Sequence, residues 1–127
     1  MAIKIEFEKQ ERAIELPDGT VLEIPERTKE NDDKIGEILR GREKKKEYEF
    51  LRTILEALFG KSGIKAIIPD EKKVNLDYLT AVYTTSVNLF YADKIEAERI
   101  EMQRQIENLE PLTDKLRDMN PLINKLK

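Results

Sequence analysis

The feature that most constrains this chain is a stretch from Asn75 to Asn108 that contains neither proline nor glycine. Asn75 is a favoured N-cap residue, and Asp77 puts a negative charge in the first turn, where the helix dipole favours one. The sequence therefore predicts one long helix, roughly 50 Å in length at ~1.5 Å per residue. Its first half carries an apolar face that includes Leu79 and Tyr83, whereas its second half is charged around a thin apolar stripe. We expect the rest of the chain to cover the first half and the second half to project from it.

Composition limits how much of the chain can be buried. Charged residues make up 39% of the 127 residues, against about a quarter in an average soluble domain. We expect a compact α+β domain at residues 1–92 and a charged, amphipathic helical extension at residues 93–127. The formal net charge of -3 provides no field that would recruit nucleic acid or an anionic membrane surface, so neither is expected as a partner.

The residue types that the chain lacks exclude several kinds of chemistry. It has no cysteine and no histidine. This excludes disulfides, thiolate nucleophiles, zinc sites of the usual kind and the side chain that most easily transfers protons near neutral pH. The first residues form no apolar run of signal-peptide length, and no window reaches the ~18 apolar residues of a membrane span. We expect a soluble, cytoplasmic protein.

The first two dozen residues have the patterns of a small antiparallel sheet. Residues 3–8 alternate between apolar and charged side chains, which predicts a strand with one buried face. Two further apolar segments, 13–16 and 21–24, flank Pro17-Asp18-Gly19-Thr20, a sequence with the turn chemistry of a hairpin. The prediction is a two- or three-stranded sheet that needs a helix to cover its apolar face.

Helical patterns begin after the predicted sheet. Thr28 is a suitable N-cap for a helix whose buried stripe includes Ile35. A second amphipathic helix extends from Tyr48 to Phe59 and is predicted to end at Gly60 in a left-handed cap. A short helical turn is expected over residues 64–68. The predicted fold class is thus α+β, mainly α, with a long C-terminal helix and a broken helical tail.

The tail keeps one heptad register across two prolines, Pro111 and Pro121. Positions seven residues apart are apolar, and companion positions become apolar after Asn108. Two interpretations stay open: short helices that fold back as a hairpin, or a broken amphipathic arm that a partner straightens. The candidate partner-binding or self-association residues are Ile95, Met102, Ile106, Leu109, Leu112, Leu116 and Met119. The alternative is that the same residues pack within one molecule.

The sequence offers no constellation that points to an enzyme, a metal or a cofactor. The five glycines are scattered, and Gly60-Lys61-Ser62 lacks the earlier glycine and the strand of a phosphate-binding loop. The basic residues between Arg42 and Lys46 have glutamates beside them and are interpreted as a solvated surface rather than a nucleic-acid patch. The tyrosines of the long helix are interpreted as core packing rather than a platform for stacking bases. We expect binding and assembly, and no catalysis.

The middle of the chain is similar to a known family. Its elements are EYEFLRTILEALFG, then IIPD, then NLDYLTAVYTTSVNLFY. With a short hairpin before them and a charged helical tail after them, they resemble the small tail assembly chaperones of long-tailed phages and prophages of Gram-positive bacteria. The resemblance implies a mostly helical body, self-association into oligomers, and binding of the tape measure protein while tail tube subunits polymerise around it. It implies no catalytic or cofactor-binding residue and places the protein in the cytoplasm of the bacterial host.

Three functional hypotheses follow from these patterns and from the resemblance. The first is a tail assembly chaperone that binds the tape measure protein by helix–helix packing. The second is a structural or connector subunit that is retained in the phage particle. The third is a small helical adaptor or regulator.

Overall fold

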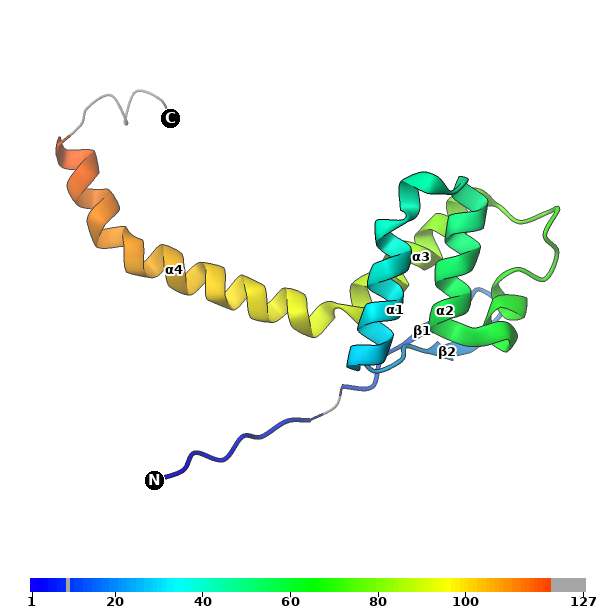
Figure 1. Ribbon diagram of the computed structural model, residues 1–127, viewed down its shortest axis with the longest axis horizontal. Helices are drawn as coiled ribbons and strands as arrows, with labels where there is room; N and C mark the ends of the chain where they lie inside the picture. The colour runs from blue at the N-terminus through cyan, green and yellow to red at the C-terminus, as the bar shows by residue number, and fades with distance from the viewer. Residues whose placement is uncertain (9, 120–127) are drawn as a thin grey trace. The chain divides into compact units, whose positions relative to one another are not determined.

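A computed structural model describes the backbone of residues 1–8 and 10–119, and the side chains as far as residue 107 (Figure 1). The chain divides into two compact units, Met1–Tyr91 and Ala92–Lys127. It is mainly helical, with a small two-stranded antiparallel sheet, so the α+β, mainly α class is confirmed. Within the described residues, none of the helices has both the length and the apolar character needed to cross a membrane.

The predicted hairpin is confirmed. Strands β1 (Ala13–Glu15) and β2 (Val21–Glu23) pair antiparallel. In the turn, the Leu16 N–H donates to the Thr20 carbonyl (2.8 Å) and the Thr20 N–H to Asp18 Oδ1 (2.9 Å). Gly19 has a φ of 91°, in the left-handed region that a residue without a Cβ reaches without strain. The Asp18 side chain and the glycine thus close the turn as their types predict.

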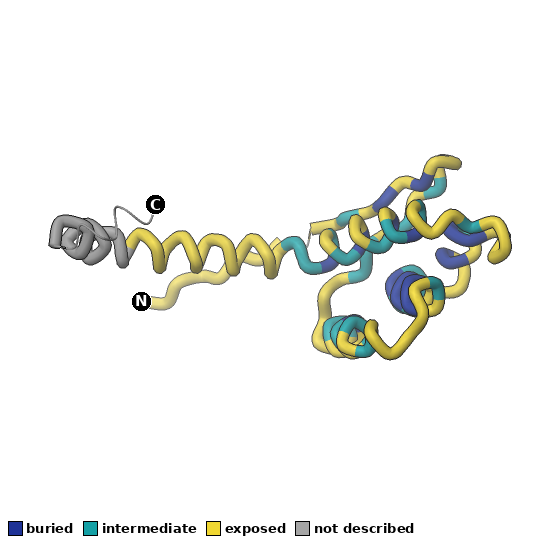
Figure 2. Tube along the Cα trace, turned by 90° about the horizontal axis from the view of Figure 1, so that it is seen from above, coloured by how far each residue is buried: buried dark blue, intermediate teal, exposed yellow. Residues whose placement is uncertain are grey.

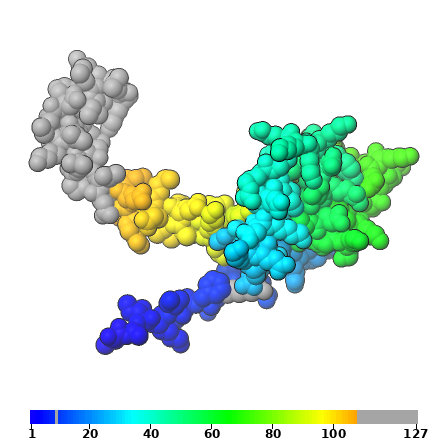
Figure 3. Space-filling view, in the orientation of Figure 1, coloured from blue at the N-terminus to red at the C-terminus, as the bar shows by residue number. Residues whose placement is uncertain are grey.

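The predicted strand at residues 3–8 is wrong. These residues belong to neither helix nor strand, and Ile3, Ile5 and Phe7 are 91%, 89% and 76% exposed. Residues 3–8 belong to the extended N-terminal segment, which is dark blue in Figure 3. The alternation of apolar and charged residues predicts which face of a strand would be buried, but it does not show that a neighbouring strand is available for pairing. The residues that lead from position 8 to Arg12 include no glycine, proline, asparagine or aspartate to turn the chain back onto β1.

Helix α1 spans Lys29–Arg40, and the 3₁₀ turn η1 spans Arg42–Lys44. Thr28 caps α1 as predicted, because its Oγ1 accepts the backbone N–H of Asn31 at 3.2 Å. Ile35 is 1% exposed and anchors the helix to the core. Ile38 and Leu39 also pack against the core, so the stripe predicted for this helix is confirmed.

Helix α2 spans Glu47–Ile67 and is kinked at Gly60, where φ is 74° and ψ is -177°. The helix is thus interrupted at the predicted residue, but in a more extended conformation than the predicted left-handed cap. A second helical segment then continues to Ile67, in place of the short turn predicted over residues 64–68. Gly63 lies so close to the preceding turn that an added Cβ would clash with Cβ of Phe59.

Helix α3 spans Leu76–Phe90, and α4 spans Ala92–Met119. The Asn75 cap is confirmed, since its Oδ1 accepts the N–H of Tyr78 at 3.0 Å. The single uninterrupted helix from Asn75 to Asn108 is wrong, because α3 ends before Tyr91. The Phe90 and Tyr91 rings meet edge to face at 4.9 Å, and both pack against the core. Neighbouring residues of a regular helix point about 100° apart, so packing both rings favours a break.

The break predicted within the tail at Pro111 is also wrong, since the helical backbone of α4 passes through that residue to Met119. An interior proline removes one backbone hydrogen bond and bends the helix. Where water can hydrogen-bond to the carbonyl group that loses its partner, the helix can bend at the proline and continue. Pro121 lies outside the described residues.

The core of the first unit is built around α2, which packs against α1 on one side and α3 on the other, with β2 also against it. Figure 2 shows the buried residues along these elements. Phe50, Ile54 and Leu55 of α2 and Leu79 of α3 are at most 2% exposed. The core thus forms within the first unit from the helices that sequence periodicity predicts.

Candidate functional site

The candidate site is the α4 stripe, defined by Ile95, Met102 and Ile106. Their exposed fractions are 50%, 63% and 60%. At 100° per residue, Met102 and Ile106 lie within about 20° of Ile95 around the helix axis. Three large apolar side chains thus share one narrow face of α4 and remain accessible to solvent, as a surface for another helix requires.

The remaining predicted residues of this surface continue along the same helix. Leu109, Leu112, Leu116 and Met119 belong to α4, but their side chains lie outside the described residues. The helical backbone of this segment keeps the heptad register of the sequence. The prediction that these residues bind a partner stays a prediction.

Ion pairs within α4 stabilise the helix beside the stripe. Arg99 donates two hydrogen bonds to the Glu96 carboxylate, at 2.7 and 3.1 Å. These hydrogen bonds, and next the guanidinium charge, hold the pKa of the Glu96 carboxyl below its ordinary value. Lys94 and Glu98 form a further pair at 3.9 Å. Ion pairs of this kind stabilise an exposed helix without covering its apolar side chains.

The sequence interpretation missed one exposed apolar residue of α4. Ile100 is 46% exposed, but five residues after Ile95 it lies about 140° around the helix from the stripe. Charged residues surround it in the sequence, so no heptad register includes it. Its position makes it a control for any test of the stripe.

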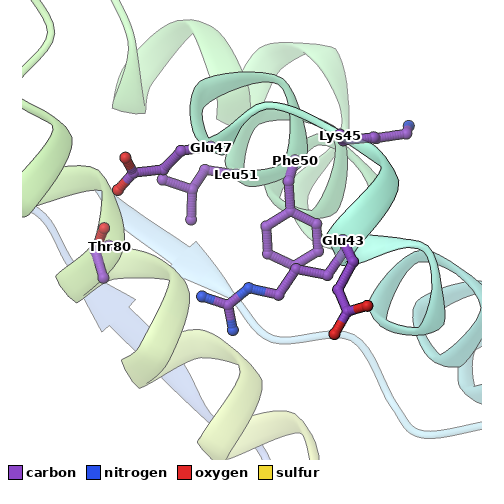
Figure 4. Close-up of a pocket in the computed structure, with 7 residues that line it drawn as sticks. Glu43, Lys45, Glu47, Phe50, Leu51 and Thr80 are labelled. Atoms are coloured by element: carbon purple, nitrogen blue, oxygen red, sulfur yellow. The ribbon is translucent and has the colours of Figure 1, made fainter.

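The first unit has a half-open cavity of about 570 Å³ beside η1, and Figure 4 shows its lining. The Arg42 guanidinium lies 5.3 Å from the Phe50 ring centroid and 5.9 Å from that of Tyr83. Arg42 and Lys45 share the lining with Glu43 and Glu47. Because the charges of the lining balance, it provides no basic groove for phosphate or nucleic acid. Arg42 instead joins η1, α2 and α3 through its two aromatic contacts.

The tyrosines pack as predicted and are not an exposed stacking platform. Tyr78, Tyr83 and Tyr91 are half-buried against the core. Tyr83 meets Phe50 edge to face, with ring centroids 5.4 Å apart. Burial raises the pKa of Tyr78 and of Tyr91. Raised phenol pKa values keep these side chains neutral, as packing in the core favours.

Among the side chains that the structure describes, the buried hydroxyl groups of Tyr48 and Ser86 have no hydrogen-bond partner. Burial raises the pKa of Tyr48, and the nearby Glu71 carboxylate raises it further. Ser86 is fully buried on α3. Since neither hydroxyl group is hydrogen-bonded to a base in the described part of the chain, neither is arranged as an activated nucleophile.

Among the described side chains, no group of three acidic residues is arranged to hold a metal ion. A comparison with protein families, with curated proteins and with solved structures finds no match to this chain.

Proposed function

We propose that this protein is a non-enzymatic phage tail assembly chaperone. It binds the tape measure protein in the cytoplasm of the bacterial host, through helix–helix packing by α4 and association with copies of itself. The observation that carries the proposal is the α4 stripe, where three large apolar side chains of one helix face are at least half exposed. The family resemblance of residues 47–91 supplies the identity of the partner.

The size of the stripe indicates how such binding works. Burying one large apolar side chain contributes about 1.5–3 kcal/mol, and side chains that are already half covered gain about half of that. The described part of the stripe therefore contributes a few kcal/mol, which is too little to offset the entropic cost of association by itself. One copy holds a client weakly, whereas several copies along one long amphipathic helix hold it firmly through multivalency. Weak individual contacts also let tube subunits displace the chaperone.

The test compares two aspartate substitutions on the same helix. Met102→Asp puts a charge on the stripe, and Ile100→Asp puts the same charge about 140° away. The chain is co-expressed with the candidate client, a tape measure protein, and the soluble fraction of this client is measured. We expect Met102→Asp to lower this fraction and Ile100→Asp to leave it unchanged. Equal effects of the two substitutions, or none from Met102→Asp, contradict the role of the stripe.

Mass spectrometry of purified phage particles separates the chaperone from a structural subunit. A chaperone is absent or substoichiometric in the finished particle. If the protein is present in a fixed number of copies, the structural-subunit hypothesis replaces the proposal.

A further inference from the structure

The first unit contains a segment with the pattern of a strand and a sheet with open edges. The N-terminal arm, residues 3–8, alternates apolar and charged side chains and lies exposed outside any strand. The sheet of the described residues has two strands, so β1 and β2 each have one edge without a neighbouring strand. We propose that the N-terminal arm of one molecule adds as a third, antiparallel strand to the β2 edge of a second copy.

The β2 edge has backbone groups ready for such pairing. The Ile24 N–H donates to the Arg12 carbonyl at 2.8 Å, which fixes the residues that face β1. In an antiparallel pair the alternate residues, here Val21 and Glu23, point their N–H and C=O groups away from the partner strand. Both side chains are exposed, and no hydrogen bond is recorded for these outward groups in the described part of the chain. An added strand can satisfy all four groups.

Burial favours β2 over β1. Ile14 on β1 and Leu16, the residue that follows this strand, are only 8% and 4% exposed, so the apolar side chains there are already covered. Leu22 on β2 and Ile24, the residue that follows this strand, are half-buried. Apolar surface therefore remains beside β2 for an arriving strand to cover.

One pairing register between the N-terminal arm and β2 places both the apolar and the charged side chains of the arm favourably. With Ile5 opposite Leu22, Ile3 falls opposite Ile24, and the apolar side chains of the arm extend the apolar face of the sheet. The period of two then places the charged residues of the arm on the other face.

Charge on the other face agrees with this register. Lys4 falls opposite Glu23, an attractive cross-strand pair, and Glu6 falls opposite Val21, which is uncharged. These two pairs are also the ones whose backbones exchange hydrogen bonds at the β2 edge. A shift by one residue would expose the apolar side chains and bring Lys4 opposite Leu22.

The length of the chain requires that the arm come from another molecule. An arm antiparallel to β2 is parallel to β1 of the same sheet. Parallel strands of one chain need a crossover connection of about a dozen residues or more, whereas few residues separate the arm from Arg12. The arm therefore cannot reach its own β2 in this direction. A second copy has no such restriction.

Engineered cysteines test the proposal cleanly because the chain has none of its own. Lys4→Cys protein is mixed with Glu23→Cys protein of a different tag length under mild oxidation. Opposite residues of a hydrogen-bonded pair have Cα atoms about 5.5 Å apart, within the disulfide range. We expect a mixed disulfide between the two chains. The matched control mixes Lys4→Cys with Glu15→Cys, at the β1 edge, where no excess over random collision is expected.

Two further substitutions test the register on the Lys4→Cys chain. Ile5→Asp is expected to lower the rate of mixed disulfide formation by about tenfold or more, since burying one isoleucine contributes on that order to an association constant. Ala2→Asp adds the same charge beyond the paired residues and should have little effect. Ile5 is exposed in the single molecule, so its substitution leaves the fold intact.

Three outcomes overturn the proposal: no cross-linking to Glu23→Cys, equal cross-linking to Glu15→Cys, or equal effects of the two aspartates. Because the assay reports on the arm and β2, its failure leaves the client-solubility test of α4 untouched.

Discussion

Gly60 provides a direct test of the physical account of the fold. Its φ of 74° and ψ of -177° lie in a region that is essentially restricted to glycine, and holding another residue there costs of order 1–3 kcal/mol. A Cβ at this position would meet no atom within 4 Å. Gly60→Ala therefore changes backbone strain without a steric clash, and the expected loss in the free energy of unfolding is about 1–3 kcal/mol.

Thermal denaturation followed by circular dichroism measures this loss. The first unit, Met1–Tyr91, carries the core, and for a domain of that size each kcal/mol shifts Tm by roughly 4–8 °C. We expect Gly60→Ala to lower Tm by at least several degrees. Urea denaturation at constant m-value provides an independent measure of the same difference.

The matched control is Gly41→Ala. Gly41 has a φ of -88°, and an added Cβ would lie 3.6 Å from the Ile38 carbonyl oxygen of the preceding turn, an ordinary contact. Alanine fits there and restricts the unfolded chain, so Tm should stay the same or rise. If Gly60→Ala is as stable as Gly41→Ala, the kink does not require glycine and the reasoning is refuted.

Two further predictions concern side chains. Ser86→Ala removes a buried hydroxyl group that has no partner, so the free energy of unfolding should rise, by about 1 kcal/mol, in urea denaturation; a loss of stability would mean that the hydroxyl group makes a hydrogen bond. The pKa of Glu96 is lowered by Arg99, so this pair stabilises α4 fully above the ordinary glutamate pKa and loses its effect as the pH falls through the lowered value. Helicity at 222 nm should therefore fall with pH in the wild type more than in Arg99→Gln, and equal titrations would refute the effect.

Local chemistry explains the parts of the fold that the sequence predicts correctly. Asp18 and Gly19 close the hairpin through contacts within a few residues, and Thr28 and Asn75 cap their helices through the N–H three positions later. Such features depend on a residue and its immediate neighbours, so a single sequence is sufficient to find them.

The incorrect predictions depend on distant parts of the chain. The break at Tyr91 has no glycine or proline to mark it and reflects two rings that both pack against the core. The segment at residues 3–8 has the period of a strand, but periodicity does not reveal whether an edge is available. Proline at position 111 predicts an end, whereas the helical backbone continues.

The candidate site shows the same division. Charged residues occupy most of the surface of α4 and leave only a narrow apolar stripe. The exposure of Ile95 and Met102 on this stripe therefore follows from the sequence. In contrast, the position of Arg42 over Phe50 and Tyr83 brings together three separate segments. No local pattern in the sequence indicates this contact.

The distribution of buried residues separates two kinds of evolutionary constraint. Among the side chains that the structure describes, every buried hydrophobic one lies between Ile14 and Phe90. Substitutions at the exposed residues of α4 therefore replace no buried side chain of that core. If α4 binds a partner as proposed, its sequence can change with that partner while the sequence of the first unit stays under selection for folding.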